Sequence, residues 1–527
     1  MTARRQPDFA YEVDVDDVQA IALQAFKALT EAQFLFVREL RGPRVGDWLK
    51  TLAEVVARGA AERRDALAVN VAFTHLGLQA IGLDAPTRKQ FGVAFQQGMS
   101  GGGGHRSWEL GDVEDSAPLH WRWGNTPPPD DAPPADARPP SRPVHAVLLL
   151  YAGSAEALQR LVADQRRLAA DCGVELYGED VEIPMRGEWP RADARPTDRS
   201  GDPRGAVQGL REHFGFVDGI SQPEFRLRAD ALDPALVAPG ELLLGYPDES
   251  GARPPSPLVP ASPAALDARL AAGANGMLDL GRNGTYLVFR QIAQDVHGFW
   301  EFAQAHAQEL GTIEHCAAKL IGRWRNGAPL TDTPQQPADL NGLDERNTFQ
   351  FATDDAAGRS CPVGAHVRRA NPRDALPGFS PQRSLDAVQR HRILRRGRPF
   401  GAPLSGWPDP ERMLAAAREH LAGDDPWPRG MHFICLNADI ERQFEFIQRR
   451  WINDPTFVNQ RADEVDPILG RQRGNPTFRV PADPTPLLLG RGTVKLRRFT
   501  RVIGGEYFFL PSQRALRYLA AVAAAPG

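Results

Sequence analysis

The sequence feature that most constrains the fold is a strand–helix pattern that occurs twice. Phe34-Leu-Phe-Val-Arg38 is followed ten residues later by Trp48. Tyr286-Leu-Val-Phe-Arg290 is followed by Trp300 at the same spacing, so the second copy lies 252 residues beyond the first. Each copy is a short apolar run that leads into an amphipathic segment, which predicts a strand and then a helix.

A second pair of segments repeats in the same way. His145-Ala-Val-Leu-Leu-Leu150 is similar to His432-Phe-Ile-Cys-Leu436, and each precedes a helix-like segment, at residues 155–168 and 440–451. Two copies of this plan predict an α+β protein made of duplicated ferredoxin-like domains, with antiparallel sheets and flanking helices. Coincidence between apolar strands is the alternative.

Loop-like stretches interrupt this plan. Four stretches rich in Pro, Gly, Asp and Arg lack periodicity and are predicted to be surface insertions: residues 126–143, 186–205, 247–264 and 326–347. We place the boundary between the copies in the third. The predicted divisions are an N-terminal domain over residues 1–245, a Pro-rich linker over 246–275 and a C-terminal domain over 276–527.

Composition limits the classes of partner and the compartment. The 527 residues carry a formal net charge of −4, which favours neither a nucleic-acid partner nor an anionic membrane. The four cysteines are far apart and form no CxxC pair, which favours a reducing cytoplasm. Arg4-Arg5 is not followed by an apolar segment, and the longest apolar run, residues 146–155, is too short for a bilayer. We therefore expect no signal peptide and no transmembrane segment.

Two short motifs carry residues suited to catalysis. In Gly215-Phe-Val-Asp218-Gly219 the glycines allow a tight turn that presents the Asp218 carboxylate into a pocket. His366 follows in Gly364-Ala-His366-Val-Arg368, and neutral imidazole is the usual axial ligand in haem proteins that react with peroxide. The plainer alternatives are an Asx-turn cap for Asp218 and a histidine bonded to backbone for His366.

An arginine cluster follows the histidine motif. Arg392, Arg395, Arg396 and Arg398 lie within seven residues, and strand alternation sets Arg395 on the face opposite to the other three. An inward Arg395 beside Asp218 would stabilise negative charge that develops on a departing peroxide oxygen. Among the arginines near His366, Arg373 is the candidate to bind a cofactor carboxylate.

Taken in order, these motifs resemble those of the dye-decolourising peroxidase family, and the resemblance spans most of the chain. Further segments carry it: Val69–Thr74, Gly77–Gly82, Phe95–Met99, Leu110–Asp112, Gly284–Arg290, Gln294–Val296, Phe444–Gln448, Trp451–Asn453 and Gly505–Pro511. The resemblance implies the duplicated ferredoxin-like fold of the DyP-type dimeric α/β-barrel superfamily. It also implies haem b (iron protoporphyrin IX) and the oxidation of bulky aromatic reductants, dyes and phenols, by hydrogen peroxide in one-electron steps.

The same resemblance implies roles for individual residues. Asp218 is the acid–base residue, Arg395 the distal arginine and His366 the iron ligand. Met431 and Phe433 would wall the distal pocket, although an aliphatic residue is usual at the first of these positions. Asp466 would bond the proximal imidazole and make it more anionic.

One alternative function remains at this stage. A haem-handling protein of the deferrochelatase-like kind, with weak peroxidase activity, would keep His366 but need neither Asp218 nor Arg395. Their joint presence favours the peroxidase. Exposed sheets that pair are compatible with a homodimer.

Overall fold

The structure is a computed structural model. It describes residues 11–59, 67–101, 104–125, 143–178, 186–188, 211–229, 236–337, 347–404, 409–420, 429–457, 464–491 and 493–525. The predicted insertions at 126–143 and 186–205 lie almost wholly outside these ranges.

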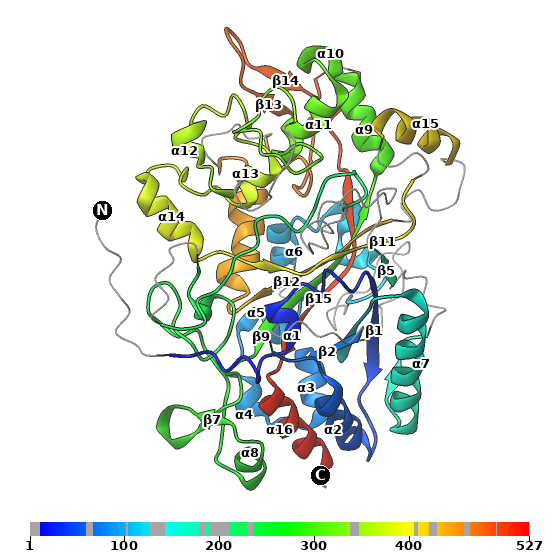
Figure 1. Ribbon diagram of the computed structural model, residues 1–527, viewed down its shortest axis with the longest axis vertical. Coiled ribbons are helices and arrows are strands. Elements are labelled where there is room, and N and C mark those ends of the chain that lie inside the picture. Colours follow the sequence, from blue (N-terminus) through cyan, green and yellow to red (C-terminus); the bar gives the residue numbers. More distant parts are fainter. Residues whose placement is uncertain are drawn as a thin grey trace, which may run out of the picture.

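One antiparallel sheet of ten strands organises the described residues (Figure 1). Its N-terminal half has the order β4-β1-β3-β2, and helices join β1 to β2 and β3 to β4. This is the βαββαβ arrangement of a ferredoxin-like unit. Its elements are β1 (Glu31–Glu39), α2 (Val45–Val55), β2 (Leu67–Phe73), β3 (Ala146–Ala152), α7 (Ala155–Asp171) and β4 (Glu175–Leu176).

The C-terminal half repeats this order. Strand β15 pairs with β9, β9 pairs with β12, and β12 pairs with both β10 and β11, which together take the place of the second strand. The elements are β9 (Thr285–Gln294), α9 (Val296–Ala305), β10 (Leu394–Arg395), β11 (Arg398–Phe400), β12 (Gly430–Asn437), the π-helical η7 (Glu441–Glu445) and η8 (Ile447–Ile452), and β15 (Thr500–Leu510). The predicted duplication is confirmed, and the repeated Trp48 and Trp300 are both buried in the helices that follow β1 and β9.

The two halves close into a ring through two narrow contacts. Phe73 of β2 pairs with Phe509 of β15, and Gly187 of β5 (Arg186–Glu188) pairs with Phe400 of β11. Alternate residues from the strands of both halves then meet in one buried cluster. We infer that this cluster fills the inside of a barrel, because successive strand residues point to opposite faces.

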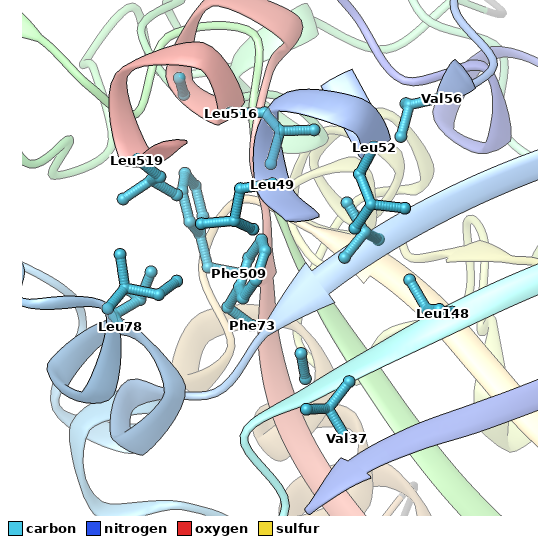
Figure 2. Close-up of a cluster of buried hydrophobic side chains, with 14 of the residues drawn as sticks. Val37, Leu49, Leu52, Val56, Phe73, Leu78, Leu148, Phe509, Leu516 and Leu519 are labelled. Carbon is cyan, nitrogen blue, oxygen red and sulfur yellow. The ribbon is translucent and has the colours of Figure 1, made fainter. Parts of the chain in front are cut away.

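The outer face of the N-terminal half is covered by helices. Leu49 and Leu52 of α2 pack with Leu516 and Leu519 of α16 (Gln513–Ala524) over the sheet residue Phe73 (Figure 2). Each side chain is almost completely buried, which is worth about 1.5–3 kcal/mol per residue. The N-terminal core is therefore completed by the last described helix.

The outer face of the C-terminal half carries a second helical layer, with α9, α11 (Ile313–Ile321) and α13 (His366–Ala370) above the sheet in Figure 1. The remaining helices are α1 (Ala20–Leu23), α3 (His75–Ile81), α4 (Ala85–Arg88), α5 (Val93–Gln97), α6 (Gly104–Leu110), η1 (Glu114–Ser116), η2 (Pro118–His120), η4 (Pro239–Glu241), α8 (Pro263–Asp267), η5 (Ala274–Gly276), α10 (Ala307–Leu310), α11 (Ile313–Ile321), α12 (Phe351–Asp354), α13 (His366–Ala370), α14 (Pro381–Gln389) and α15 (Pro410–His420).

Short strands form two smaller sheets, made of β6 (Leu258–Val259), β7 (Ala271–Ala272) and β8 (Leu278–Asp279), and of β13 (Phe478–Val480) and β14 (Leu487–Leu489). The first lies partly within the predicted Pro-rich linker, which also contains α8. The predicted division into residues 1–245, 246–275 and 276–527 stays a prediction. The strands of both halves belong to one sheet, so the sheet marks no boundary between domains. Among the described helices, none has the length and apolar character needed to cross a membrane.

Candidate active site

The Asp218 carboxylate stands on a tight turn that glycine makes possible. Gly215 and Gly219 have φ values of 92° and 81°, in the left-handed region that favours glycine. The turn is held at its base, because Val217 N donates to the Arg325 carbonyl at 2.9 Å. Within the turn, Gly219 N donates to Asp218 Oδ1 at 2.6 Å. The side chain of Asp218 is 22% exposed, so it faces a partly open space.

Arg395 meets this carboxylate from the sheet. Its Nη1 lies 3.2 Å from Asp218 Oδ1 and its Nη2 donates to the Ile220 carbonyl at 2.9 Å. Its backbone N donates to Gln222 Oε1 at 2.9 Å. These three contacts fix the Asp218 turn against β10 and leave Asp218 Oδ2 without a bond to Arg395. An acceptor oxygen that is not engaged by the arginine is what a proton-transfer residue requires.

The other arginines of the cluster point elsewhere. Arg396 Nε donates to the Ile21 carbonyl at 2.7 Å, and Arg398 Nη2 donates to the Phe26 carbonyl at 2.9 Å, both away from Asp218. Arg392, however, precedes β10, so strand alternation does not apply to it. Its Nη2 lies 3.4 Å from the Ser221 carbonyl, on the side of the Asp218 turn. The expectation that Arg392 faces away with the other two is therefore wrong.

His366 is the first residue of α13 and is held by a buried carboxylate. Its Nδ1 lies 2.9 Å from Asp466 Oδ2. Asp466 is fully buried, and its Oδ1 accepts from Ile468 N and Leu469 N. Burial raises the pKa of Asp466, but the facing imidazole of His366 and the N–H donors outweigh burial and hold that pKa below its usual range. Asp466 is therefore a fixed anion that directs the other ring nitrogen, Nε2, outward.

The Nε2 nitrogen could bind a metal ion whose other ligands come from a cofactor. Among the described residues no hydrogen bond to this atom is found, and the His366 side chain is 25% exposed. Within the same residues, no three His, Cys, Asp or Glu side chains gather so as to hold a metal ion. A metal bound through His366 would need its other ligands from a cofactor such as a porphyrin.

Met431 and Phe433 lie on the sheet face of Arg395. Arg395 pairs with Cys435 in the ladder, and residues two and four positions before Cys435 point to the same side of β12. Both are half-buried, whereas His432 between them is buried on the barrel side. The Phe433 ring lies 6.1 Å from the Phe444 ring. Both predicted wall residues thus face the same layer as the Asp218–Arg395 pair.

Arg373 connects the histidine segment to the Asp218 turn. Its Nη1 donates to the Phe349 carbonyl at 2.9 Å, its Nη2 lies 3.5 Å from Ser221 Oγ, and its guanidinium stacks 3.9 Å above the Phe349 ring. Burial, together with the charges of Arg323 and Arg392, lowers the pKa of Arg373 to about 9. Its Nε is buried without a hydrogen-bond partner. Buried polar groups are rarely left unpaired, so this arginine fits an anionic ligand such as a haem propionate.

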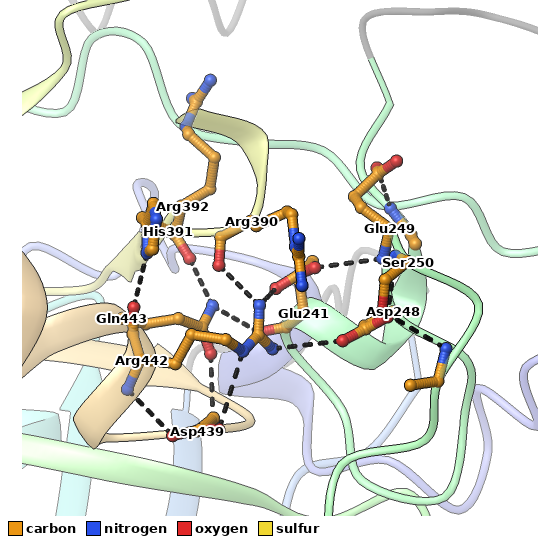
Figure 3. A network of polar contacts seen from close by, with 12 residues as sticks. Glu241, Asp248, Glu249, Ser250, Arg390, His391, Arg392, Asp439, Arg442 and Gln443 are labelled. Atoms are coloured by element: carbon orange, nitrogen blue, oxygen red, sulfur yellow. Dashed lines mark hydrogen bonds and ion pairs between the residues drawn. The ribbon is translucent and has the colours of Figure 1, made fainter. Parts of the chain in front are cut away.

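A polar network that the sequence did not reveal positions the segment before Arg395 (Figure 3). Arg442 Nη1 donates to the Arg390 carbonyl at 2.6 Å and bonds Glu241 Oε2 at 2.7 Å. Gln443 Nε2 donates to the Arg392 carbonyl at 2.6 Å. The helix η7 thus fixes the backbone that leads into β10. No local pattern marks these residues, because Glu241 and Arg442 lie 201 positions apart.

The buried Glu241 predicts a measurable pH effect on stability. Burial raises the pKa of Glu241 from 4.5 to about 7, more than the Arg442 charge lowers it. A carboxyl with a raised folded pKa stabilises below its unfolded pKa, and this contribution is lost as pH rises through the folded value. We expect the stability of the wild type relative to Glu241→Gln to fall by about 2 kcal/mol between about pH 5 and pH 8.

Urea unfolding of both proteins at the two pH values measures this difference. The subtraction removes the titration of all other groups, including buried histidines such as His213, whose pKa burial lowers to about 4. A difference that stays constant, or that grows with pH, contradicts the raised pKa of Glu241.

Comparison with known proteins shows what the chain as a whole is similar to. No family model matches the chain. It is 26% identical to dye-decolorizing peroxidase msp1 of Mycetinis scorodonius over 97% of the chain and 88% of that protein. It is 28% identical to a dye-decolorizing peroxidase of Mycena epipterygia over 97% of the chain and 87% of that protein. The chain is a homologue of the dye-decolorizing peroxidases.

A solved structure agrees with this relationship. A dye-decolorizing peroxidase in complex with 2,6-dimethoxyphenol superposes with a TM-score of 0.65 over 97% of the chain and all of that protein, at 22% identity. At this identity the likeness shows the fold, which is that of the dye-decolorizing peroxidases. The roles of Asp218, Arg395, His366 and Asp466 stay predictions. In the structure Asp218 contacts Arg395, and His366 contacts Asp466.

Proposed function

We propose that this homologue of the dye-decolorizing peroxidases is a haem peroxidase that reduces hydrogen peroxide to water and oxidises bulky aromatic reductants, dyes and phenols, in one-electron steps. The observation that carries the proposal is the contact between Asp218 and Arg395, which lies in the same layer as Met431 and Phe433. The cofactor is haem b, with His366 Nε2 as its protein ligand and Arg373 at one carboxylate. When bound, haem supplies the iron that accepts oxidising equivalents from peroxide.

The chain's own residues then move a proton and stabilise charge. Asp218 Oδ2 takes the proton of one peroxide oxygen and returns it to the other, which leaves as water. Oδ1 cannot serve as easily, because it already accepts from Gly219 N and Arg395. The Arg395 guanidinium stabilises the negative charge on the departing oxygen. The Asp218 turn and the sheet therefore supply the acid–base and the electrostatic parts of the reaction separately.

The alternative of haem handling requires His366 alone. A protein that only binds haem or removes its iron has no use for an arginine that bonds a carboxylate and is held to the same segment by two further contacts. This arrangement, and the peroxidase names of the homologues, favour the peroxidase. Cytoplasmic location, which rests on the dispersed cysteines, and homodimer formation are also part of the proposal.

Haem-loaded protein mixed rapidly with one equivalent of hydrogen peroxide tests the proposal. A fast change of the Soret band, followed by recovery when 2,6-dimethoxyphenol is added, is the expected result. Haem that binds through His366 without a peroxide-dependent change would instead favour haem handling. No haem binding, with His366→Ala indistinguishable from the wild type, would reject both.

Removal of the buried partner of His366 has an expected effect on haem affinity. In Asp466→Asn the imidazole loses its ionised acceptor and its fixed orientation, and such outer partners are worth about tenfold to a hundredfold in metal affinity or activity. We expect haem dissociation to be faster by that factor, measured by transfer of haem to an apoglobin. Asp267→Asn, on the exposed end of α8, is the control. Equal dissociation rates in all three proteins would show that Asp466 does not support the ligand.

A further inference from the structure

Met431 places a thioether in the layer of the candidate active site. It pairs with Ile292 of β9, and directly paired residues point to the same face of a sheet. Two residues further along β9, on the same face, Gln294 Nε2 donates to Glu212 Oε2 at 2.7 Å. Glu212 begins the segment that carries Asp218, so this segment is fixed to the sheet close to Met431.

The far end of that segment is fixed on the other side of Met431. Asp218 bonds Arg395, and Arg395 pairs with Cys435, four residues after Met431 on β12. Met431 therefore lies between the two points at which the segment is attached to the sheet. It is half-buried, so its side chain is not sealed in a packed core.

The other sulfur atoms of the described residues are protected or lie elsewhere. All four cysteines are buried, and burial raises the pKa of each thiol, whereas the thiolate is the form that peroxide oxidises readily. Of the four methionines that the structure describes, Met99 and Met413 are almost completely buried. Met277 is half-buried like Met431 but precedes β8. The small sheet of β8 includes β7, which lies in the lower part of Figure 1, away from β12.

We propose that the Met431 thioether is oxidised to the sulfoxide by the hydrogen peroxide that Asp218 and Arg395 activate, an inference that rests on the proposed function. The sulfur gives two electrons to one peroxide oxygen. The S–O bond forms, the O–O bond breaks, and the proton of the first oxygen passes to the second, which leaves as water. Asp218 carries that proton and Arg395 stabilises the departing oxygen.

Oxidation changes the wall of the site. A thioether is apolar and flexible, and its sulfoxide is polar, so a polar group then stands beside Ile292. Such a wall binds apolar aromatic reductants less well. The enzyme therefore loses activity when peroxide is present without a reductant, and a reductant protects Met431 because it consumes the oxidising equivalents first.

Mass spectrometry of the haem-loaded protein tests the proposal. The protein is treated with excess hydrogen peroxide without a reductant and digested, and sulfoxide is followed with time at Met431 and at Met277. We expect sulfoxide to form at Met431 at least about tenfold faster than at Met277, because acid–base catalysis acts only at the first. Asp218→Asn should remove this difference by slowing Met431 alone. Addition of 2,6-dimethoxyphenol should protect Met431.

Loss of activity should follow the same residue. The activity of each variant is followed relative to its own initial rate during exposure to peroxide. Met431→Leu, a substitution of similar volume, should lose activity several-fold more slowly than the wild type. Met277→Leu removes a thioether of similar exposure outside the site, and should lose activity as the wild type does.

Several outcomes would overturn the inference. Equal rates at Met431 and Met277, or oxidation of Met431 that neither Asp218→Asn nor Arg395→Gln slows, would mean that peroxide in solution attacks the sulfur without help from the pair. Thermal unfolding confirms that these variants are folded. A wild type that oxidises 2,6-dimethoxyphenol but keeps Met431 unmodified contradicts this inference alone. One that neither oxidises the phenol nor changes its Soret band contradicts the proposed function.

Discussion

We expect haem-loaded Asp218→Asn to react with hydrogen peroxide about 10²–10⁴-fold more slowly than the wild type, with haem affinity unchanged. The amide keeps the shape of the carboxylate and can still accept from Gly219 N and Arg395 through its oxygen. It cannot, however, take a proton at the second position, where Asn presents an NH₂ group. Rapid mixing over a range of peroxide concentrations gives the second-order rate constant.

The control for this substitution is Asp267→Asn, which removes an exposed carboxylate at the end of α8. It should react at the wild-type rate. Arg395→Gln provides a second comparison, because it keeps the proton acceptor but removes the fixed charge. A rate for Asp218→Asn within threefold or so of the wild type would show that another group moves the proton, and the turn at Asp218 would then be structural.

Loss of Arg442 should destabilise the folded protein strongly. In Arg442→Met the fully buried Glu241 keeps its carboxyl but loses the ion pair at 2.7 Å. Removing one partner of a buried ion pair costs about 3–5 kcal/mol, because the other charge stays buried without compensation. We expect a loss approaching this size in the free energy of unfolding at about pH 9, where Glu241 is ionised in the wild type, measured with urea. The loss should be smaller at neutral and acid pH, because burial raises the pKa of Glu241 to about 7 and the carboxyl takes up a proton there.

Two further variants identify the cause. Arg449→Met removes an arginine of the same helical region that is 44% exposed and pairs with Glu109, and should change stability by less than about 1 kcal/mol. Adding Glu241→Gln to Arg442→Met should restore most of the lost stability, because the unpaired charge is then absent. No recovery in the double variant would mean that the bond from Arg442 to the Arg390 carbonyl matters more than the ion pair.

The sequence predicted the duplicated fold and the two pairs of site residues for different reasons. The fold was predictable because the strand and helix periodicity occurs twice, with Trp48 and Trp300 each at the same distance from the apolar run before it. Asp218, His366 and Arg395 could be predicted from the sequence because each lies in a short motif with glycine or proline nearby. Asp466 was suggested only by resemblance, and the structure places it 2.9 Å from His366. What these residues do in catalysis still awaits the experiments above.

Other parts of the site were not predictable from the sequence. The position of Arg392 depended on where β10 begins, and a two-residue strand gives too little alternation to fix that boundary. The Glu241–Arg442 network joins segments far apart in the sequence, and neither residue has a distinctive neighbourhood. The buried ion pair between Arg290 and Asp112 also arises from long-range contact, because Asp112 comes from the other half of the chain.

The closure of the ring has a consequence for synthesis on the ribosome. Strand β2 needs β15, and the leucines of α2 need those of α16, which emerges more than 450 residues later. A nascent N-terminal half therefore exposes an apolar face and an unpaired strand edge until translation has passed Ala524. Such surfaces are the ones that aggregate or recruit chaperones. For this protein the yield of folded enzyme in a cell is then set by how long the unfinished chain is protected, as well as by the stability of the finished barrel.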